Sequence, residues 1–377
     1  MKNLYSAFVF PIVHGRAGAA LLVVLAYTGC AGCSSPWTSI PGGGSARYGN
    51  ERGRLAVASW NVQALFDDQE DGTEYAEYRT AAGWDEPSYR RRLELLAQAV
   101  RSIGDKGPDL LALQEVENAQ VLSDLSQELQ ANSPYPWVCF STNPGSPLGV
   151  GLLSRFPLAG ATVHSSQKDG IPLPRPILEV RVEVEDALVI LLICHWKSKL
   201  GGEEETEPLR RAAAGVAARR LRELEVQFPE AAVLVVGDLN ENVDEFTRRG
   251  GVSGTALMPD TPQAFGLNAS EGDGTEFLLI SPKKPPEAEH FSENLCLYEP
   301  WFDAPWPGSY YYQGVWETID HMLLSPSLFD SRGWDFEAFS VIDGEPFTAS
   351  GLPSPYNPRI GKGLSDHLPL VSLLRRN

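Results

Sequence analysis

The chain has 377 residues, with 49 acidic against 31 basic side chains and a formal net charge of −18. This excess of acid argues against a general nucleic-acid coat protein or a polybasic membrane binder, because both rely on cation-rich surfaces. The hydrophobic content of 43% is too high for a disordered chain, and five cysteines are too few for a disulfide scaffold. We therefore expect a folded domain, and the acidic charge does not exclude an enzyme that meets a phosphate through a metal ion.

Residues 1–29 have the composition of a targeting segment. They carry no acid, and their two bases, Lys2 and Arg16, precede an apolar run from Ala17 to Tyr27. The length of that run suits the core of a signal peptide and falls short of the roughly 20 residues that cross a bilayer. We therefore expect residues 1–29 to direct export, to the periplasm, the extracellular space, or the outer or cytoplasmic membrane.

The end of this segment is similar to a bacterial lipoprotein signal. Cys30 and Cys33 lie among small residues, and the similarity implies a membrane anchor through a lipid at Cys30 or Cys33. An ordinary cleaved secretory signal and a retained N-terminal anchor are the alternatives. Residues 30–50 are rich in glycine and proline and are expected to form a flexible tether. Residues 51–377 are then expected to form a single catalytic domain.

The first half of this domain is predicted to alternate short strands with two helices. An acidic loop over residues 67–86 follows the first strand and is expected to be a solvated flap, although it could gate a site or bind a second cation. Periodic apolar residues predict helices over 89–103 and 119–130. Glu185 and Asp186 are expected to form a hairpin turn between two strands. The predicted strands of this half cover residues 55–59, 110–113, 137–140, 150–153, 177–184 and 188–194.

The second half begins with the clearest helix, over residues 208–228. Acidic residues 203–207 suit the positive end of its dipole, and Pro208 suits its first turn. Residues 241–315 are expected to be irregular. Strands are predicted over 233–236, 319–324 and 368–374. The three cysteines of the body are scattered and are expected to be single buried thiols; they are Cys139, Cys194 and Cys296.

Seven polar residues lie at the ends of predicted strands or just inside them. Polar side chains at strand ends gather along one edge of a sheet, which is the usual place for the site of an α/β enzyme. A group of this size suits a metal and phosphate site better than a solvated surface. The seven residues are Asn61, Glu115, His195, Asp238, Asn240, Asp320 and His367.

Each of these signals also has an ordinary structural explanation. Glu115 follows an apolar strand, where a carboxylate is costly unless it is solvated, paired or bound to metal. Asp238 and Asn240 are two residues apart, so on an extended segment both side chains point the same way, but they could instead form an Asx turn. The glycine before them leaves room for a ligand. A lone histidine such as His195 is more often structural, and residues 365–367 could be a turn with a capping aspartate.

Taken in order, seven motifs resemble those of the endonuclease/exonuclease/phosphatase superfamily, in its deoxyribonuclease-like branch of bacterial secreted and lipoprotein nucleases. The resemblance runs from about Leu55 to Leu374. It implies a four-layer α/β (α+β) sandwich of two mixed β-sheets flanked by helices, which the strand pattern alone does not predict. The motifs are Ser59-Trp-Asn61, Gln114-Glu115-Val-Glu, Gly151-Leu-Leu-Ser-Arg-Phe-Pro, His195-Trp-Lys-Ser, Gly237-Asp-Leu-Asn240, Ile319-Asp320-His and Ser365-Asp-His367-Leu-Pro.

The resemblance implies a metal ion and an activated water. The implied metal is Mg²⁺, with Mn²⁺ or Ca²⁺ as alternatives, because a hard cation with oxygen ligands neutralises the charge that builds on phosphate. Glu115 would be the principal metal ligand, with Asn61 helping at the same metal. Asp238 would orient or deprotonate the attacking water, and Asn240 would hold that water or a phosphate oxygen.

The remaining motif residues are implied to act on the transition state. His195 and His367 would stabilise it as protonated donors, with Asp320 hydrogen-bonded to the second histidine. Asp366 would lie beside the metal or the water. Arg175 resembles an arginine that contacts phosphate in deoxyribonuclease-like members. No carboxylate partner for the first histidine is evident in the sequence.

The resemblance favours a nuclease that hydrolyses DNA or RNA. His195-Trp-Lys-Ser-Lys and residues 311–320 are similar to segments of bacterial extracellular and periplasmic nucleases. The alternatives are a phosphatase or sphingomyelinase-like phospholipid phosphodiesterase on the same site, with a phosphorylated lipid or inositol as partner, and a surface lipoprotein that has lost catalysis. A monomer is expected.

Two features bear on how a nucleic acid would be held. The aromatic residues between 298 and 316 could stack single-stranded bases, although such residues more often pack in the core. The overall acidic charge counts against tight duplex binding. Four local bases could offset it near the cleft: Lys197, Lys199, Arg210 and Arg211.

Overall fold

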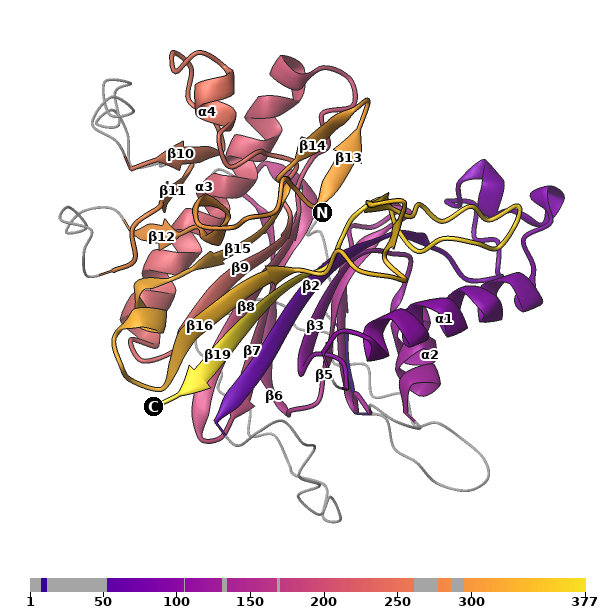
Figure 1. The fold of residues 1–377 in the computed structure, drawn as a ribbon, viewed down its shortest axis with the longest axis horizontal. Coiled ribbons are helices and arrows are strands. Elements are labelled where there is room, and N and C mark those ends of the chain that lie inside the picture. The colour runs from indigo at the N-terminus through magenta and orange to yellow at the C-terminus, as the bar shows by residue number, and fades with distance from the viewer. Residues whose placement is uncertain are drawn as a thin grey trace.

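The computed structural model describes residues 8–11, 53–104, 106–130, 134–167, 170–260, 277–285 and 295–377 (Figure 1). Two large β-sheets face each other, and helices lie on their outer sides. The predicted signal and tether lie outside the described residues, except for residues 8–11, which form a short edge strand. Within the described ranges, no helix is long and apolar enough to cross a membrane.

One sheet has seven strands in the order β1-β4-β5-β3-β2-β19-β16. Its central pair, β2 and β3, is parallel, so the carboxyl ends of both strands lie at the same edge. The other neighbouring pairs are antiparallel. The strands are β1 (Phe8–Pro11), β2 (Arg54–Leu65), β3 (Leu110–Val116), β4 (Trp137–Ser141), β5 (Gly149–Ser154), β16 (Trp334–Val341) and β19 (Leu370–Arg376).

The other sheet has eight strands in the order β10-β11-β12-β15-β9-β8-β7-β6. Its parallel pair β8 and β9 places His195 beside Asp238. Because β15 runs antiparallel to β9, it begins where β9 ends, and Asp320 lies opposite Asp238. The strands are β6 (Leu158–Ser166), β7 (Pro172–Val184), β8 (Ala187–His195), β9 (Ala232–Asp238), β10 (Leu257–Pro259), β11 (Leu278–Ser281), β12 (Cys296–Tyr298) and β15 (Asp320–Leu324).

Helices cover both outer faces and complete four layers (Figure 1). Helices α1 (Glu86–Arg101) and α2 (Ala119–Leu129) pack on the seven-stranded sheet, and their N-termini are capped by Asp85 and Asn118. Helix α3 (Glu203–Gln227) packs on the eight-stranded sheet. This arrangement confirms the sandwich of two mixed sheets that the family resemblance implies. Shorter elements are α4 (Glu245–Arg248), β13 (Tyr310–Tyr312), β14 (Val315–Glu317), β17 (Thr348–Ala349), β18 (Leu352–Pro353) and the 3₁₀ turns 76–78, 80–82, 300–302 and 326–329.

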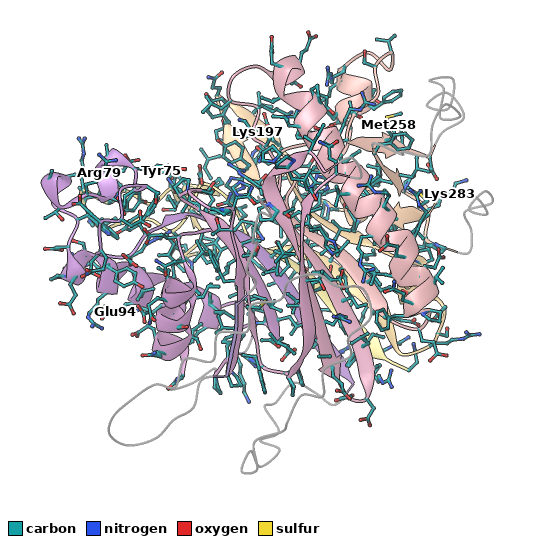
Figure 2. All side chains as sticks on the ribbon, turned by 180° about the vertical axis from the view of Figure 1, so that it is seen from behind. Tyr75, Arg79, Glu94, Lys197, Met258 and Lys283 are labelled. Carbon is teal, nitrogen blue, oxygen red and sulfur yellow. The ribbon has the colours of Figure 1, made fainter. Side chains whose placement is uncertain are left out.

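The acidic loop is more firmly anchored than the solvated flap predicted for residues 67–86. Tyr78 and Trp84 are buried, and their rings meet edge to face with centroids 4.9 Å apart. Trp84 also contacts the ring of Tyr356. Figure 2 shows Tyr75 and Arg79 of this loop at the edge of the molecule. Buried aromatic side chains therefore anchor a loop whose acidic composition had predicted a solvent-exposed flap. Two carboxylates of this loop, Asp71 and Glu74, lie within 4.8 Å of each other and of Glu117, which directly follows β3.

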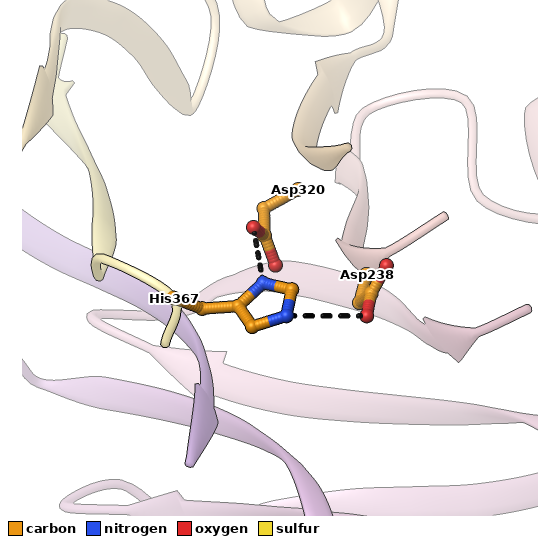
Figure 3. Close-up of side chains that lie close together, drawn as sticks. All are labelled: Asp238, Asp320 and His367. Carbon is orange, nitrogen blue, oxygen red and sulfur yellow. Dashed lines mark hydrogen bonds and ion pairs between the residues drawn. The ribbon is translucent and has the colours of Figure 1, made fainter. Parts of the chain in front are cut away.

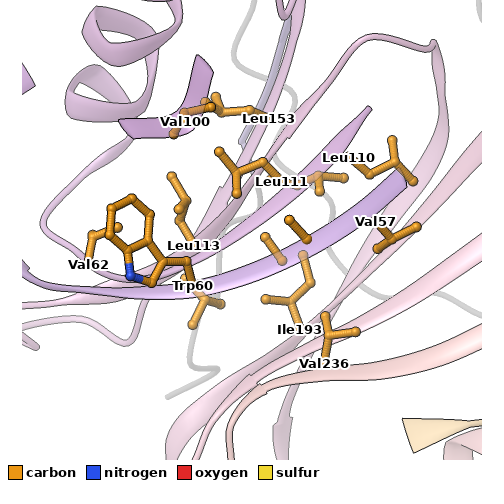
Figure 4. Close-up of a cluster of buried hydrophobic side chains, with 14 of the residues drawn as sticks. Val57, Trp60, Val62, Val100, Leu110, Leu111, Leu113, Leu153, Ile193 and Val236 are labelled. Atoms are coloured by element: carbon orange, nitrogen blue, oxygen red, sulfur yellow. The ribbon is translucent and has the colours of Figure 1, made fainter. Parts of the chain in front are cut away.

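The core explains why β8 reads as a continuous apolar run. Successive side chains of a strand point to opposite faces. Leu191 and Ile193 face the other sheet, whereas Ile190 and Leu192 face α3, so both faces are buried. Figure 4 shows the inner cluster, in which Ile193 and Val236 of one sheet lie near side chains of the other. Cys139, Cys194 and Cys296 are free and buried, as expected.

Several element boundaries differ from those predicted. Strands β2 and β3 extend to Leu65 and Val116, so Asn61 and Glu115 lie inside strands and not after them. Helix α3 begins at Glu203, so Pro208 lies inside the helix and not in its first turn as predicted, and the acids 203–205 occupy that turn instead. Residues 241–315, predicted as irregular, contain α4, β10 to β13 and a 3₁₀ turn, and β6 and β16 were not predicted.

Candidate active site

The strand-end residues come together, but at matching edges of two sheets and not along one edge of a single sheet. Strands β2, β3, β8 and β9 end here. Strands β15 and β19 begin here, because each is antiparallel to one of the four. The contacts given below link the predicted group Asn61, Glu115, His195, Asp238, Asn240, Asp320 and His367 into one cluster.

Glu115 is turned into the site by irregular backbone. Its φ is 64°, in the left-handed region, and the pairing of β3 with β5 shifts register at this residue. A bulge of this kind re-aims a side chain, and such a conformation costs of order 1 kcal/mol or more in a residue other than glycine. A second irregularity in β2, between Asn61 and Leu65, lets the N–H of Ala64 donate to Glu115 Oε2 at 2.8 Å. Two strained strand ends therefore fix this carboxylate.

Asp238 lies at the centre of the cluster. Its Oδ2 accepts a hydrogen bond from Asn61 Nδ2 at 3.0 Å and lies 3.5 Å from His195 Nε2 and 4.0 Å from His367 Nε2. Its Oδ1 accepts the backbone N–H of Asn240 at 2.9 Å. The residue is only 2% exposed. Asp238 Oδ2 thus faces both histidines and the side-chain amide of Asn61, which also contacts Glu115.

His367 is held by both its ring and its backbone. Figure 3 shows the contacts of the ring with Asp320 and Asp238. Its Nδ1 donates to Asp320 Oδ2 at 2.8 Å, and the same oxygen accepts from Ser309 Oγ at 2.6 Å. Its N–H donates to Ser365 Oγ, and its carbonyl accepts from Trp60 Nε1. The ring is therefore fixed with Nε2 directed at the centre of the site.

The electrostatic environment shifts the pKa values of the two histidines in opposite directions. Burial raises the pKa of Asp238 to about 7, with the Asp320 charge adding to the rise and His367 opposing it. Burial opposes the charge on His367, but the Asp320 carboxylate and its hydrogen bond raise the pKa well above its ordinary value. Burial lowers the pKa of His195 well below its ordinary value, and the charge of Arg175 adds to this. The surroundings therefore favour the charged form of His367 and the neutral form of His195, whereas the family resemblance implied two protonated histidines.

The other implied residues also reach the site. Arg175 Nη1 donates to the carbonyl of Trp196 at 2.6 Å, and Asn240 Nδ2 donates to the same carbonyl at 3.2 Å. Asp366 is half-buried, and its charge helps raise the pKa of His367. The backbone after β8 therefore positions both Arg175 and Asn240.

Gly237 serves the contact between strands and not the space for a ligand that the sequence suggested. Its φ is 132°, and a Cβ at this position would lie 2.0 Å from the carbonyl oxygen of Cys194 in β8. A side chain here would push β8 away from β9 and so separate His195 from Asp238.

Two of the bases expected near the cleft are already paired with carboxylates. Arg210 is 0% exposed, with Nε 2.8 Å from Glu241 Oε2 and Nη2 2.6 Å from Glu207 Oε2. Lys199 Nζ lies 2.7 Å from Glu245 Oε2. Arg210 also donates to the carbonyl of residue 197, so it joins the loop after β8 to the loop after β9. These two cations therefore hold the loops around the site together. Because they are paired, they leave less positive charge for a substrate than expected.

Arg210→Gln is expected to lower the free energy of unfolding by about 3–5 kcal/mol, because it leaves Glu241 buried without its cation and leaves Glu207 only its pair with Arg249. Urea unfolding followed by circular dichroism measures this. The matched control is Arg248→Gln, which breaks the exposed pair with Asp244 and should cost less than about 1 kcal/mol. Equal losses in the two variants would contradict a supporting role for Arg210.

The sequence did not single out two residues that complete the site. Ser309 donates to the Asp320 oxygen that holds His367. The ring of Tyr310 stacks on the imidazole of His367, with centroids 4.5 Å apart and planes 30° apart. Tyr310 belongs to the aromatic stretch noted above, which was its only signal. Nothing in the local sequence marked Ser309, because its contact with Asp320 forms only when the loop before β13 packs against β15.

The charge balance of the cluster fits a divalent cation. Four carboxylates converge, belonging to Glu115, Asp238, Asp320 and Asp366, and the two cations His367 and Arg175 oppose only part of their charge. Carboxylate and amide oxygens are the ligands that Mg²⁺ prefers. The side chain of Glu115 is 24% exposed, which makes it the more open end of the set, with Asn61 beside it. Asp238, Asp320 and His367 also form a compact group, but the hydrogen bond to Asp320 occupies the imidazole Nδ1.

A family model described as endonuclease/exonuclease/phosphatase family matches residues 56–256. No curated protein matches the sequence. The chain is similar to the crystal structure of truncated Caenorhabditis elegans TDP2, with 19% identity, a TM-score of 0.49, and coverage of 85% of this chain and 97% of that one. It is also similar to an endonuclease/exonuclease/phosphatase family protein from Bacteroides thetaiotaomicron (15% identity, TM-score 0.48, 86% and 95% covered). The human Nocturnin catalytic domain with bound sulfate is a third similar structure (15% identity, TM-score 0.46, 86% and 94% covered).

Proposed function

Because the chain belongs to the endonuclease/exonuclease/phosphatase family, we propose that it is a metal-dependent phosphodiesterase, with DNA or RNA as the favoured substrate. The observation that carries the proposal is the position of Asp238. Its buried carboxylate faces two histidines in opposite protonation states and shares Asn61 with the more open carboxylate of Glu115. This is the arrangement that attack of water on a phosphodiester needs.

The residues divide the work of that attack. With a pKa of about 7, Asp238 can orient a water and accept its proton near neutral pH. His367, kept charged by Asp320, can donate from Nε2 to a phosphate oxygen as negative charge develops there. His195 is neutral, so its Nε2 can donate or accept a hydrogen bond without adding charge. Arg175 and Asn240 lie on the side of the Trp196 carbonyl, where they can orient the phosphate.

Glu115 and Asn61 would hold the metal ion, and Mg²⁺ suits their oxygen donors. When bound, the ion would neutralise the charge that builds on the phosphate. Glu115 is held for this by the N–H of Ala64 and by the amide of Asn61. The left-handed backbone at Glu115 aims the carboxylate into the site, where these two hydrogen bonds hold it.

Export and lipid anchoring remain part of the proposal. They rest on the sequence of residues 1–29 and on Cys30 and Cys33. The mass of the mature N-terminal peptide tests them: a lipidated cysteine at its first position would support the anchor, and an unmodified Met1 would contradict it.

The proposed activity is tested with a panel of substrates in Mg²⁺ and in EDTA. The panel holds single-stranded DNA, duplex DNA, RNA, sphingomyelin and inositol polyphosphates. Cleavage of nucleic acid in Mg²⁺ and none in EDTA is the expected result. Cleavage of only the lipid or inositol substrates would reassign the enzyme to the phosphatase and phospholipid branch. A folded protein that cleaves none of them would contradict the proposal.

A further inference from the structure

A small hairpin beside the site presents aromatic rings on a defined face. Strands β13 and β14 are joined by Gln313 and Gly314, both with positive φ, as a tight hairpin turn requires. Tyr310 and Tyr312 are two residues apart and so share one face. Tyr311 lies on the other face, with its ring centroid 5.2 Å from that of Trp316. The hairpin projects beyond the upper edges of the two sheets (Figure 1).

This face is tied to the catalytic histidine. Ser309, directly before β13, donates to Asp320 at 2.6 Å, and its carbonyl accepts the N–H of Leu368. The Tyr310 ring stacks on His367, 4.5 Å away. The Tyr312 ring follows, 6.1 Å from that of Tyr310 with only 13° between the planes. The rings therefore form a row that starts at His367 and leads outward.

The outer end of the row is free to bind. Tyr312 is 53% exposed, so its ring is open to a ligand. Gln313 Nε2 donates to its hydroxyl at 3.0 Å and restrains the ring. A planar ring held parallel to its neighbour offers a surface for a third planar group, since stacking gains energy without needing charge.

The charges around the site favour stacking over binding to the phosphate backbone. A protein that grips a polyanion uses unpaired lysine and arginine side chains. Here Arg210 is buried between two glutamates, and Lys199 is paired with Glu245. Acidic side chains also lie close to the row. Burial raises the pKa of Tyr310, and the negative charges of Asp366 and Glu317 raise it further. Two of the four basic side chains expected near the cleft are therefore already neutralised, which leaves a larger share of the affinity to contacts with the nucleic-acid bases.

We propose that Tyr312 stacks on a base of single-stranded nucleic acid and so orients the strand as it enters the site at His367. This inference rests on the proposed function and narrows its substrate to single strands or unpaired ends. A paired base within a duplex cannot offer its face to Tyr312 without unstacking, which costs energy.

The test measures binding separately from cleavage. Binding of fluorescein-labelled oligothymidylate is followed by fluorescence anisotropy in Mg²⁺, in an Asp238→Asn background that leaves the substrate uncleaved. Adding Tyr312→Ala should raise Kd about tenfold, whereas Tyr312→Phe keeps the ring and should stay within about twofold. In the protein with Asp238 intact, Tyr312→Ala should raise KM for the oligonucleotide and leave kcat/KM for methyl p-nitrophenyl phosphate, which has no base, unchanged.

The outcomes separate the two proposals. Equal Kd values with and without Tyr312→Ala would overturn the stacking inference while leaving the activity intact. Binding of phosphocholine that depends on Tyr312, without binding of oligothymidylate, would also overturn it, in favour of a lipid headgroup. Binding of oligothymidylate that depends on Tyr312, in a protein that cleaves no diester, would support stacking and reject the proposed activity.

Discussion

His367→Ala should lower kcat by at least about 10³-fold, since it removes a charged donor that faces the reacting phosphate. Asp238→Asn should have an effect of similar size, because the amide cannot accept a proton from water. The two losses should not add in the double variant, as both residues serve the same step. Steady-state kinetics on a single-stranded oligonucleotide measures all three values.

Folding must be checked separately, because both residues are buried. Asp238→Asn keeps the shape of the side chain, so its unfolding midpoint should change little. Asp244→Asn is the matched control: it makes the same replacement six residues along, at an exposed carboxylate that pairs with Arg248, and kcat should stay within about twofold. Full activity in folded His367→Ala protein would reject the site assignment.

Glu115→Gln should weaken Mg²⁺ binding at least about 10²-fold and reduce activity at standard Mg²⁺ correspondingly. The reason is that it removes the negative charge from the main proposed ligand, and even changes in residues that only orient ligands cost 10- to 100-fold. Isothermal titration with Mg²⁺ or Mn²⁺ measures binding without relying on turnover. Excess EDTA should abolish the activity of the unaltered protein, and added Mg²⁺ should restore it.

Glu94→Gln is the control for this experiment. Glu94 is exposed on α1 and labelled in Figure 2, and its replacement changes the same charge on the outer face of the molecule. Its Mg²⁺ titration should match that of the unaltered protein. Unchanged Mg²⁺ binding in Glu115→Gln would show that other residues bind the metal. Asp238, Asp320 and His367 form one such group.

The strands and the order of the motifs could be predicted because they depend on local sequence. The run over residues 188–194 is apolar at every position, and β8 is buried on both faces. The hairpin turn at Glu185 and Asp186 was predicted from residue type, and both residues have positive φ. The family resemblance then supplied the four-layer sandwich, which the strand pattern alone did not specify.

The aromatic segment before β15 shows where local reasoning failed. Residues 241–315 have few apolar runs, so they read as irregular, yet β10 to β12 extend the second sheet. Short strands of three or four residues are stabilised by their neighbours and carry almost no periodic signal of their own. The same holds for Ser309 and Tyr310, whose function depends on their contact with Asp320 and His367.

The residues proposed to bear the chemistry can be identified from sequence, because side-chain type at the ends of apolar strands is a local property. How they are arranged and charged depends on the packing of distant segments. Pairing of β15 with β9, and of β19 with β2, brings Asp320 and His367 to Asp238 across more than 80 residues of chain. Burial then raises the pKa of Asp238 and lowers that of His195, while Asp320 keeps His367 charged. Protonation state depends on neighbours and on exclusion of water, and both arise only when distant segments pack together.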